Sequence, residues 1–232
     1  MRRKLMAMHS QIVAFEDPLV KSICVEKFGG VDGITDRQYG TAGVKGYDGE
    51  CTYRQLAAVK NIGRAFYGKG IVKFNEFRHF TSCTKIGNLG FPKDSEVNSF
   101  TNSTLEEITL PPTFKNIGWK AFQGTRLKRL VIPEGYAYDL YESQFVNCYY
   151  LRYVEYPSTL YQRIGGYAAF LNVSNLVIVI KAKKPPLQIN ISTKREDITF
   201  YVPDESVDLY KAHAGLALYK DDRIKPLSEY QP

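Results

Sequence analysis

The chain has 232 residues with 44% hydrophobic and 24% charged side chains, which is typical of a globular protein and excludes a largely disordered or membrane-embedded one. Its formal net charge of +7 comes from basic residues interleaved with acidic ones, so it supports only a weak attraction to acidic partners and argues against nucleic-acid binding. The three histidines and four separated cysteines lack the tight spacing of metal ligands, so we expect no metal site and buried free thiols, with a Cys24–Cys51 disulfide as the alternative.

Residues 1–15 are predicted to form an N-terminal tail. The first residues are basic, as in a secretory signal peptide, but the apolar run that follows has four residues, whereas such a signal needs about 7–15. No stretch approaches the roughly 18 apolar residues of a membrane-spanning helix. We therefore expect no membrane insertion and no export through the usual secretory route.

Residues 16–85 are predicted to form a helical N-terminal cap. Asp17, with a proline after it, has the pattern of a helix start, and Gly29 has the pattern of its end. Thr52 and Gln55 match a capping box, in which each side chain bonds to the backbone of the other, and an apolar run follows them. The cap therefore contains at least two helices.

Two motifs within this cap resemble ligand-binding loops but lack the residues that such loops need. Residues 63–70 nearly match the phosphate-binding pattern G-x-x-x-x-G-K-S/T, but Gly70 stands where the magnesium-binding hydroxyl belongs. A helix precedes the motif and a predicted strand, residues 71–74, follows it, which is the reverse of the required order. Residues 44–55 resemble a calcium loop that has kept only Asp48 of its carboxylates. We therefore predict no cofactor.

Residues 86–182 contain an internal repeat, which is the strongest signal in the sequence. Each copy begins with a leucine and two further apolar residues at alternating positions, as in a short strand, and a proline then ends the strand. The first leucines of three copies lie 22 and 24 residues apart: Leu105, Leu127 and Leu151. The phenylalanines that close the copies lie 23 and 25 residues apart: Phe122, Phe145 and Phe170.

One copy of the repeat cannot bury its apolar face alone, so neighbouring copies must stack in parallel. We therefore predict an α+β protein: a short leucine-rich-repeat solenoid of about four parallel rungs, with a helical N-terminal cap and a mixed C-terminal cap. Stacking places equivalent outward residues side by side, so that opposite charges meet between the first two rungs. The rows concerned are Glu106, Lys128 and Arg152, and Glu107, Arg129 and Tyr153.

Residues 183–232 are predicted to be the mixed C-terminal cap. Residues 198–202 have the alternating pattern of a strand. Pro203 and Asp204 then begin a short helix that Gly215 ends. Such a segment would cover the apolar core that the last rung leaves open.

The repeat pattern, L-x-x-I-x-L-P followed by I-G-x-x-A-F, resembles BspA-like leucine-rich repeats, which occur in surface proteins of gut anaerobes and in proteins of their phages. The resemblance extends over nearly the whole chain. Its more specific parts lie near the two ends, at residues 15–25, 53–66, 183–186, 201–210 and 223–230. The resemblance implies adhesion or protein–protein contact without catalysis.

The sequence offers no catalytic set of its own. His9, His79 and His213 lie in the tail, in the first cap and in the second cap, and no G-x-S-x-G nucleophile motif is present. Pairs of acids such as Glu106 and Glu107 have no neighbour that suggests a shifted pKa. We therefore expect a protein that is not an enzyme.

Tyrosines are concentrated in one part of the repeat, where nine of the 17 fall between Tyr136 and Tyr167. Tyr136, Tyr156 and Tyr167 occupy positions that point inward. The others have no inward assignment, and tyrosine is enriched at interfaces because it offers a large contact area at low entropic cost. The alternative is that these side chains fill turns and edges. The predicted binding surface consists of Tyr138, Tyr141, Tyr149, Tyr150, Tyr153, Tyr161, Lys128, Arg129 and Arg152.

The resemblance and the missing export signal together favour a virion-associated protein, assembled in the host cytoplasm, that serves as a decoration, fibre-associated or host-recognition component. The alternative is an adhesion module on a bacterial cell surface that binds a glycan or a host protein. In both cases we expect the partner to be a protein or a glycan, within a larger assembly.

Overall fold

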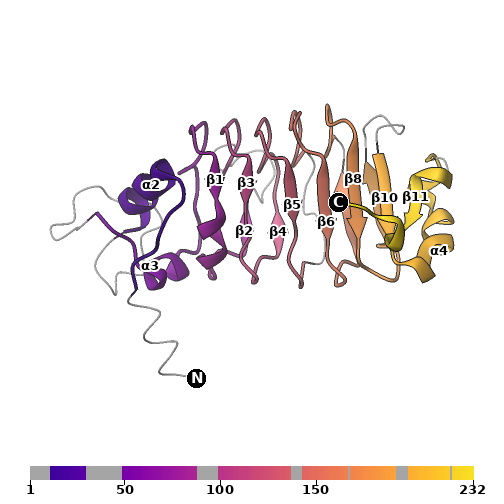
Figure 1. Ribbon diagram of the computed structural model, residues 1–232, viewed down its shortest axis with the longest axis horizontal. Helices are drawn as coiled ribbons and strands as arrows, with labels where there is room; N and C mark the ends of the chain where they lie inside the picture. Colours follow the sequence, from indigo (N-terminus) through magenta and orange to yellow (C-terminus); the bar gives the residue numbers. More distant parts are fainter. Residues whose placement is uncertain are drawn as a thin grey trace, which may run out of the picture.

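The computed structural model describes residues 11–29, 49–87, 99–136, 143–166, 168–191, 198–219 and 221–232. The molecule is elongated, with a row of parallel strands between helices at its two ends (Figure 1). The α-helices are α2 (Pro18–Phe28), α3 (Tyr53–Ala58) and α4 (Val207–Lys211). Short 3-10 turns are η1 (Asn75–His79), η4 (Asp204–Ser206), η5 (Ala214–Leu216), η6 (Asp221–Arg223) and η7 (Leu227–Glu229).

One row of strands, here called the strand wall, runs along the molecule. It consists of β1 (Lys73–Phe74), β3 (Glu107–Ile108), β5 (Arg129–Val131), β6 (Tyr153–Tyr156), β8 (Leu176–Ile180), β10 (Ile198–Val202) and β11 (Ile224–Pro226). β1 pairs with β3, the strands from β5 to β11 form one sheet, and all these pairs are parallel. Lys128 N–H donates to the Glu106 carbonyl over 3.2 Å, which links the coil of β3 to that of β5.

The strand wall is longer than the about four rungs that the sequence predicts. β1 and β10, which we expected to lie within the caps, instead pair in parallel with strands of the repeat, and β11 adds a further strand beyond β10. The register nevertheless follows the sequence repeat, because Arg129 lies opposite Tyr153 and Leu130 lies opposite Val154. Leu105, Leu127 and Leu151 are all fully buried just before their strands.

Further strands form a second wall on the return path of the coils. They are β2 (Lys85–Ile86), which pairs with β4 (Asn116–Ile117), and β7 (Arg163–Gly166), which pairs with β9 (Gln188–Ile191). Both pairs are parallel, and Ile86 lies opposite Ile117 as Ile164 lies opposite Ile189. These isoleucines are buried, so both walls contribute side chains to one core.

A column of phenylalanine rings occupies the core between the walls. The rings of successive coils are 5.5, 5.7 and 5.0 Å apart and nearly parallel, at 4°, 2° and 10°, along the series Phe100, Phe122, Phe145 and Phe170. Every ring in this column is fully buried. Because each ring needs the next for its burial, the column ties the coils together.

The turn after each phenylalanine is also repeated. Its second residue has a positive φ, which favours glycine and asparagine, in the series Asn102, Gly124, Asn147 and Asn172. Backbone N–H groups of these turns donate to the next coil, as from Gly124 to the Val146 carbonyl over 2.9 Å. The small residue that follows is buried in each case: Ser103, Thr125, Cys148 and Val173.

The N-terminal end is closed by α2 and α3. Asp17 caps α2, and its other carboxylate oxygen accepts the Val72 N–H over 2.6 Å, which fixes the helix to the start of β1. Thr52 and Gln55 form the predicted capping box of α3. Phe28 packs edge-on against Phe80 with 5.7 Å between ring centroids. All four cysteines are buried and none forms a disulfide, so the Cys24–Cys51 disulfide is not formed.

The C-terminal residues close the opposite end and then turn back. The Tyr210 hydroxyl of α4 donates to the Ala182 carbonyl over 2.8 Å and is buried. After β11, residues 227–232, here called the strap, run back over the strand wall and bring the C-terminus over β6 (Figure 1). None of the helices in the described ranges has the length and apolar character needed to cross a membrane.

Candidate binding surface

Two neighbouring tyrosines project from the edge of the strand wall. Tyr149 and Tyr150 are 57% and 52% exposed. They lie between buried Cys148 and buried Leu151, in a turn that has one more residue than the equivalent turn between Thr125 and Leu127. Because both ends of this longer turn are fixed in the core, its extra residue pushes both rings into solvent.

Two cationic side chains lie at this edge. The Arg152 guanidinium donates through Nη1 to the carbonyls of Tyr149 (2.8 Å) and Leu151 (3.0 Å), which holds the turn in place. Lys128 lies one coil earlier and forms the predicted ion pair with Glu106, with 2.6 Å between Nζ and Oε2. This pair is largely exposed, so it contributes little to stability, and the edge offers exposed aromatic rings beside positive charge.

A second cluster lies on the outer face of the strand wall. The Arg129 guanidinium lies 3.8 Å from the centroid of the Tyr153 ring, in a cation–π contact. The Tyr153 hydroxyl donates to Glu155, which also forms an ion pair with Lys181. Four side chains from three coils therefore form one network, although the expected partner of Arg129, Glu107, bonds instead to Asn75 and lies 3.7 Å from Lys73.

This network shifts the titration of its members. Burial alone raises the pKa of Glu155, but hydrogen bonds from Lys181 and Tyr153 outweigh burial, so its pKa lies below the usual value. Burial and the hydrogen bond to Glu155 raise the pKa of the Tyr153 hydroxyl well above its usual value. Glu155 is therefore ionised and Tyr153 protonated at neutral pH, which fixes Tyr153 as the donor.

The strap covers this face. The ring of Tyr230 lies 5.5 Å from the ring of Tyr153 and 5.0 Å from that of Tyr201. Tyr153 points outward from the wall, in its predicted row, yet it is only 7% exposed. The prediction of a surface tyrosine at this position is therefore wrong for the described structure, because the strap buries it.

The predicted surface residues thus fall into separate regions. Tyr149, Tyr150, Lys128 and Arg152 meet at the edge, whereas Arg129 and Tyr153 belong to the covered face. Tyr161 is 56% exposed but lies just before β7, on the return path of its coil, where its carbonyl accepts the Leu187 N–H. Tyr138 and Tyr141 lie outside the described residues. The sequence prediction missed Glu155, Lys181, Tyr201 and Tyr230, whose proximity depends on contacts between coils and with the strap.

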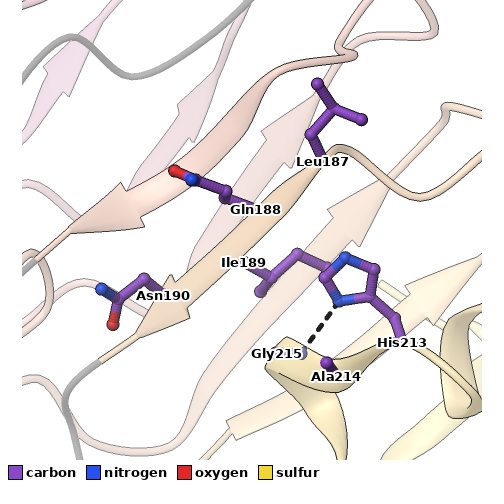
Figure 2. Close-up of a pocket in the computed structure, with 7 residues that line it drawn as sticks. All are labelled: Leu187, Gln188, Ile189, Asn190, His213, Ala214 and Gly215. Carbon is purple, nitrogen blue, oxygen red and sulfur yellow. Dashed lines mark hydrogen bonds between the residues drawn. The ribbon is translucent and has the colours of Figure 1, made fainter.

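A shallow hollow of about 350 Å³ lies where η5 meets β9. Figure 2 shows Ile189 pointing toward the imidazole of His213, whereas Gln188 and Asn190 project from the strand away from that ring. The His213 Nδ1 atom accepts the Gly215 N–H over 3.1 Å. The polar groups that line the hollow do not converge on a common point, so its geometry does not define a ligand site.

The residues considered for catalysis lie apart. His79 packs on Tyr53 with 4.6 Å between ring centroids, and burial together with Arg78 lowers its pKa. His213 lies at the opposite end of the molecule, and His9 is outside the described residues. Within the part of the chain that the structure describes, no three acidic, histidine or cysteine side chains gather as metal ligands would.

The parallel strands and the stacked phenylalanines are compatible with a leucine-rich-repeat fold, a class of domain that commonly mediates protein interactions. Residues 76–184 match the family model of the BspA type leucine rich repeat region in six copies, so this part of the chain is a BspA-type leucine-rich-repeat region. This repeat family is typically non-enzymatic. No curated protein matches the chain.

Proposed function

We propose that the chain is a non-enzymatic binding protein that holds a protein or glycan partner on the edge and outer face of its strand wall. The observation that supports this proposal is the pair Tyr149 and Tyr150, each more than half exposed on a turn fixed at both ends by buried residues. Exposed aromatic rings on a turn fixed at both ends offer contact area at a low ordering cost. Arg152 and Lys128 add positive charge beside the rings.

The proposed architecture behind this surface is a capped solenoid. In this division, residues 1–15 form a tail, residues 16–85 and 183–232 form caps, and residues 86–182 form the repeat. The caps prevent end-to-end association by covering the core of the first and last coils. Partners are then directed to the sides of the molecule, where the exposed tyrosines lie.

We further propose that the protein is virion-associated, as a decoration, fibre-associated or host-recognition component assembled in the host cytoplasm. This proposal follows from the family resemblance. Mass spectrometry of purified particles tests it directly: the chain should co-purify with the particles at a fixed ratio to their other subunits. Absence from the particles would exclude the role. The alternative, a bacterial adhesion module for a glycan or host protein, predicts the chain on the cell surface instead.

The partner class is tested with the isolated protein on a glycan array and against virion or surface subunits. Tyr149→Ala and Tyr150→Ala should each weaken partner binding at least about tenfold, because each removes an exposed aromatic anchor. Tyr161→Ala is the matched control, since Tyr161 is equally exposed but lies away from the edge. Equal losses for all three variants, or none, would contradict the proposed surface.

A further inference from the structure

The strap packs on the outer face of the strand wall through a single aromatic side chain. Its tyrosine, Tyr230, contacts Tyr153 of β6 and Tyr201 of β10, and these two strands are separated by β8. Neighbouring strands are about 4.8 Å apart, so a ring that reaches both tyrosines crosses above β8. The outward residues of β8 are Val177 and Val179, and Val179 is only 1% exposed.

These residues form a slot for one aromatic side chain, here called the tyrosine slot and defined by Tyr153, Tyr201, Val177 and Val179. One of its sides is held by contacts within the wall. Arg129 stacks on the Tyr153 ring, and the Tyr153 hydroxyl donates to Glu155. An incoming aromatic ring therefore meets this side of the slot already ordered.

Charge around the slot favours an acidic segment. Arg129 and Lys181 flank the slot and are about half exposed, and Lys225 lies opposite Tyr201 on β11. Glu155, the acid within the cluster, is already engaged by Tyr153 and Lys181. The strap carries the opposite charge to these cations, because exposed Glu229 directly precedes Tyr230.

The strap is held from outside the core. Ser228 N–H donates to Asp204 Oδ1 over 3.0 Å at its beginning, and the ring contacts of Tyr230 hold its far part. Glu229 and the two residues after Tyr230 are exposed, and Tyr230 is only partly buried. Displacing residues 227–232 would therefore open the outer face without opening the column of phenylalanine rings beneath it.

We propose that the tyrosine slot is a recognition site for an extended peptide segment with an aromatic residue next to an acid, and that the strap is its built-in occupant. A partner that carries such a segment binds the strand wall by replacing the strap. This inference deepens the proposed function and rests on it, because it names the kind of partner for the covered face. The exposed edge at Tyr149 and Tyr150 remains available whether or not the strap is in place.

The test uses a labelled peptide with the sequence of residues 226–232 and a variant that ends at Pro226, with binding followed by fluorescence anisotropy. The shortened protein should bind the peptide. The full chain should bind it at least about tenfold more weakly, because a tethered segment competes at a high effective concentration. If the shortened protein does not fold, Tyr230→Ala in the full chain takes its place and should likewise bind more tightly than the unchanged chain.

Matched controls separate slot recognition from general attraction. A peptide with alanine in place of its tyrosine should lose binding, and one with lysine in place of its glutamate should bind several-fold more weakly. In the shortened protein, Arg129→Ala and Tyr201→Ala should weaken binding, whereas Tyr161→Ala, on the other side of the molecule, should leave it unchanged. Binding that is indifferent to the peptide's tyrosine would overturn the proposal.

Failure of this inference differs from failure of the proposed function. If a folded shortened protein and Tyr230→Ala both ignore the peptide, the tyrosine slot is not a recognition site. If partner binding still depends on Tyr149 and Tyr150 in that case, the edge remains a binding surface and only the role of the covered face is lost.

Discussion

The interior and the exterior of the same coils differ in how strictly they repeat. Phe122, Phe145 and Phe170 occupy one position in three successive coils, and their rings stack at angles of 2° and 10°. At the outer edge of those coils, the equivalent positions hold Arg126 in the first, Tyr149 and Tyr150 in the second, and Ser174 and Asn175 in the third. A stacked core requires the same shape in every coil, whereas the edge is free to change from one coil to the next.

This difference separates the residues that build the protein from those available for binding. Substitutions at interior positions should lower the free energy of unfolding strongly, and by a similar amount in each coil. Exterior positions should change stability little and affect partners instead, except where the strap covers them. Variants of the two kinds therefore provide a direct check, and the following ones are ordered from the largest expected loss of stability to the smallest.

Phe145→Ala should cause the largest loss, because it removes a ring stacked between those of Phe122 and Phe170. The free energy of unfolding should fall by about 3–5 kcal/mol, as for other buried phenylalanines. Urea denaturation followed by circular dichroism measures the loss. Phe145→Leu, which leaves less empty volume, should lose clearly less. A loss below about 1 kcal/mol for the alanine variant would mean that the column does not support the fold.

Gly165→Ala should come next. Gly165 has a φ of +70°, and a Cβ atom there would lie 2.4 Å from the Asn190 carbonyl oxygen of the next coil. We expect a loss of at least about 2 kcal/mol, from the unfavourable φ and from the forced separation of β7 and β9. Gly68→Ala is the matched control, because its φ is +61° with no atom within 4 Å of the added Cβ. It should cost only the backbone strain, about 1–2 kcal/mol. If both variants lose the same stability, the unfavourable φ alone accounts for the loss and the contact with Asn190 adds nothing.

The sequence predicts the interior well because the interior repeats. Leucine and phenylalanine spacings of 22 to 25 residues locate the coils, and Tyr136 and Tyr156, predicted to point inward, are fully buried. The C-terminal end of the strand wall does not follow this pattern. β10 and β11 lack the leading leucine of the repeat, so only their parallel pairing identifies them as its continuation.

The outer face is harder to predict because its contacts come from distant parts of the chain. Tyr153 and Tyr230 are separated by more than three coils in sequence, and no spacing connects them. Glu155 and Lys181 meet because their strands are neighbours, although they occupy different positions in their coils. Exposure at such positions depends on what covers them, which a single coil's sequence does not contain.

Glu155→Gln tests whether the covered face also contributes to stability. The change removes a carboxylate that accepts from Tyr153 and pairs with Lys181, so we expect a loss of about 1–2 kcal/mol at pH 7. The folded-state pKa of Glu155 lies below its usual value, so its contribution is present above the usual pKa and is lost as the pH falls through the lowered one. The difference in stability between the two proteins should therefore begin to shrink as the pH falls below the usual glutamate pKa, about 4.3, and vanish below the lowered one.

The comparison for this pair is Glu107→Gln. Glu107 is half exposed and lies 3.7 Å from Lys73, so screening by water limits its effect to about 0.5 kcal/mol or less. Unfolding curves at several pH values measure both variants. A Glu155→Gln loss that stays constant from pH 7 to pH 3 would mean that shape, and not charge, accounts for it.

Tyr149→Ala should have the smallest effect on stability. The ring is 57% exposed and its turn is held through backbone carbonyls by Arg152, so truncation should change the free energy of unfolding by no more than about 0.5 kcal/mol. Arg152→Ala should cost more, since it releases the turn itself, although its side chain is also exposed. If Tyr149→Ala lost as much stability as Phe145→Ala, the edge would be part of the core, and the separation between building and binding residues would fail. A silent Tyr149→Ala that nonetheless abolishes partner binding would place recognition on the exposed edge of this coil and not on its core.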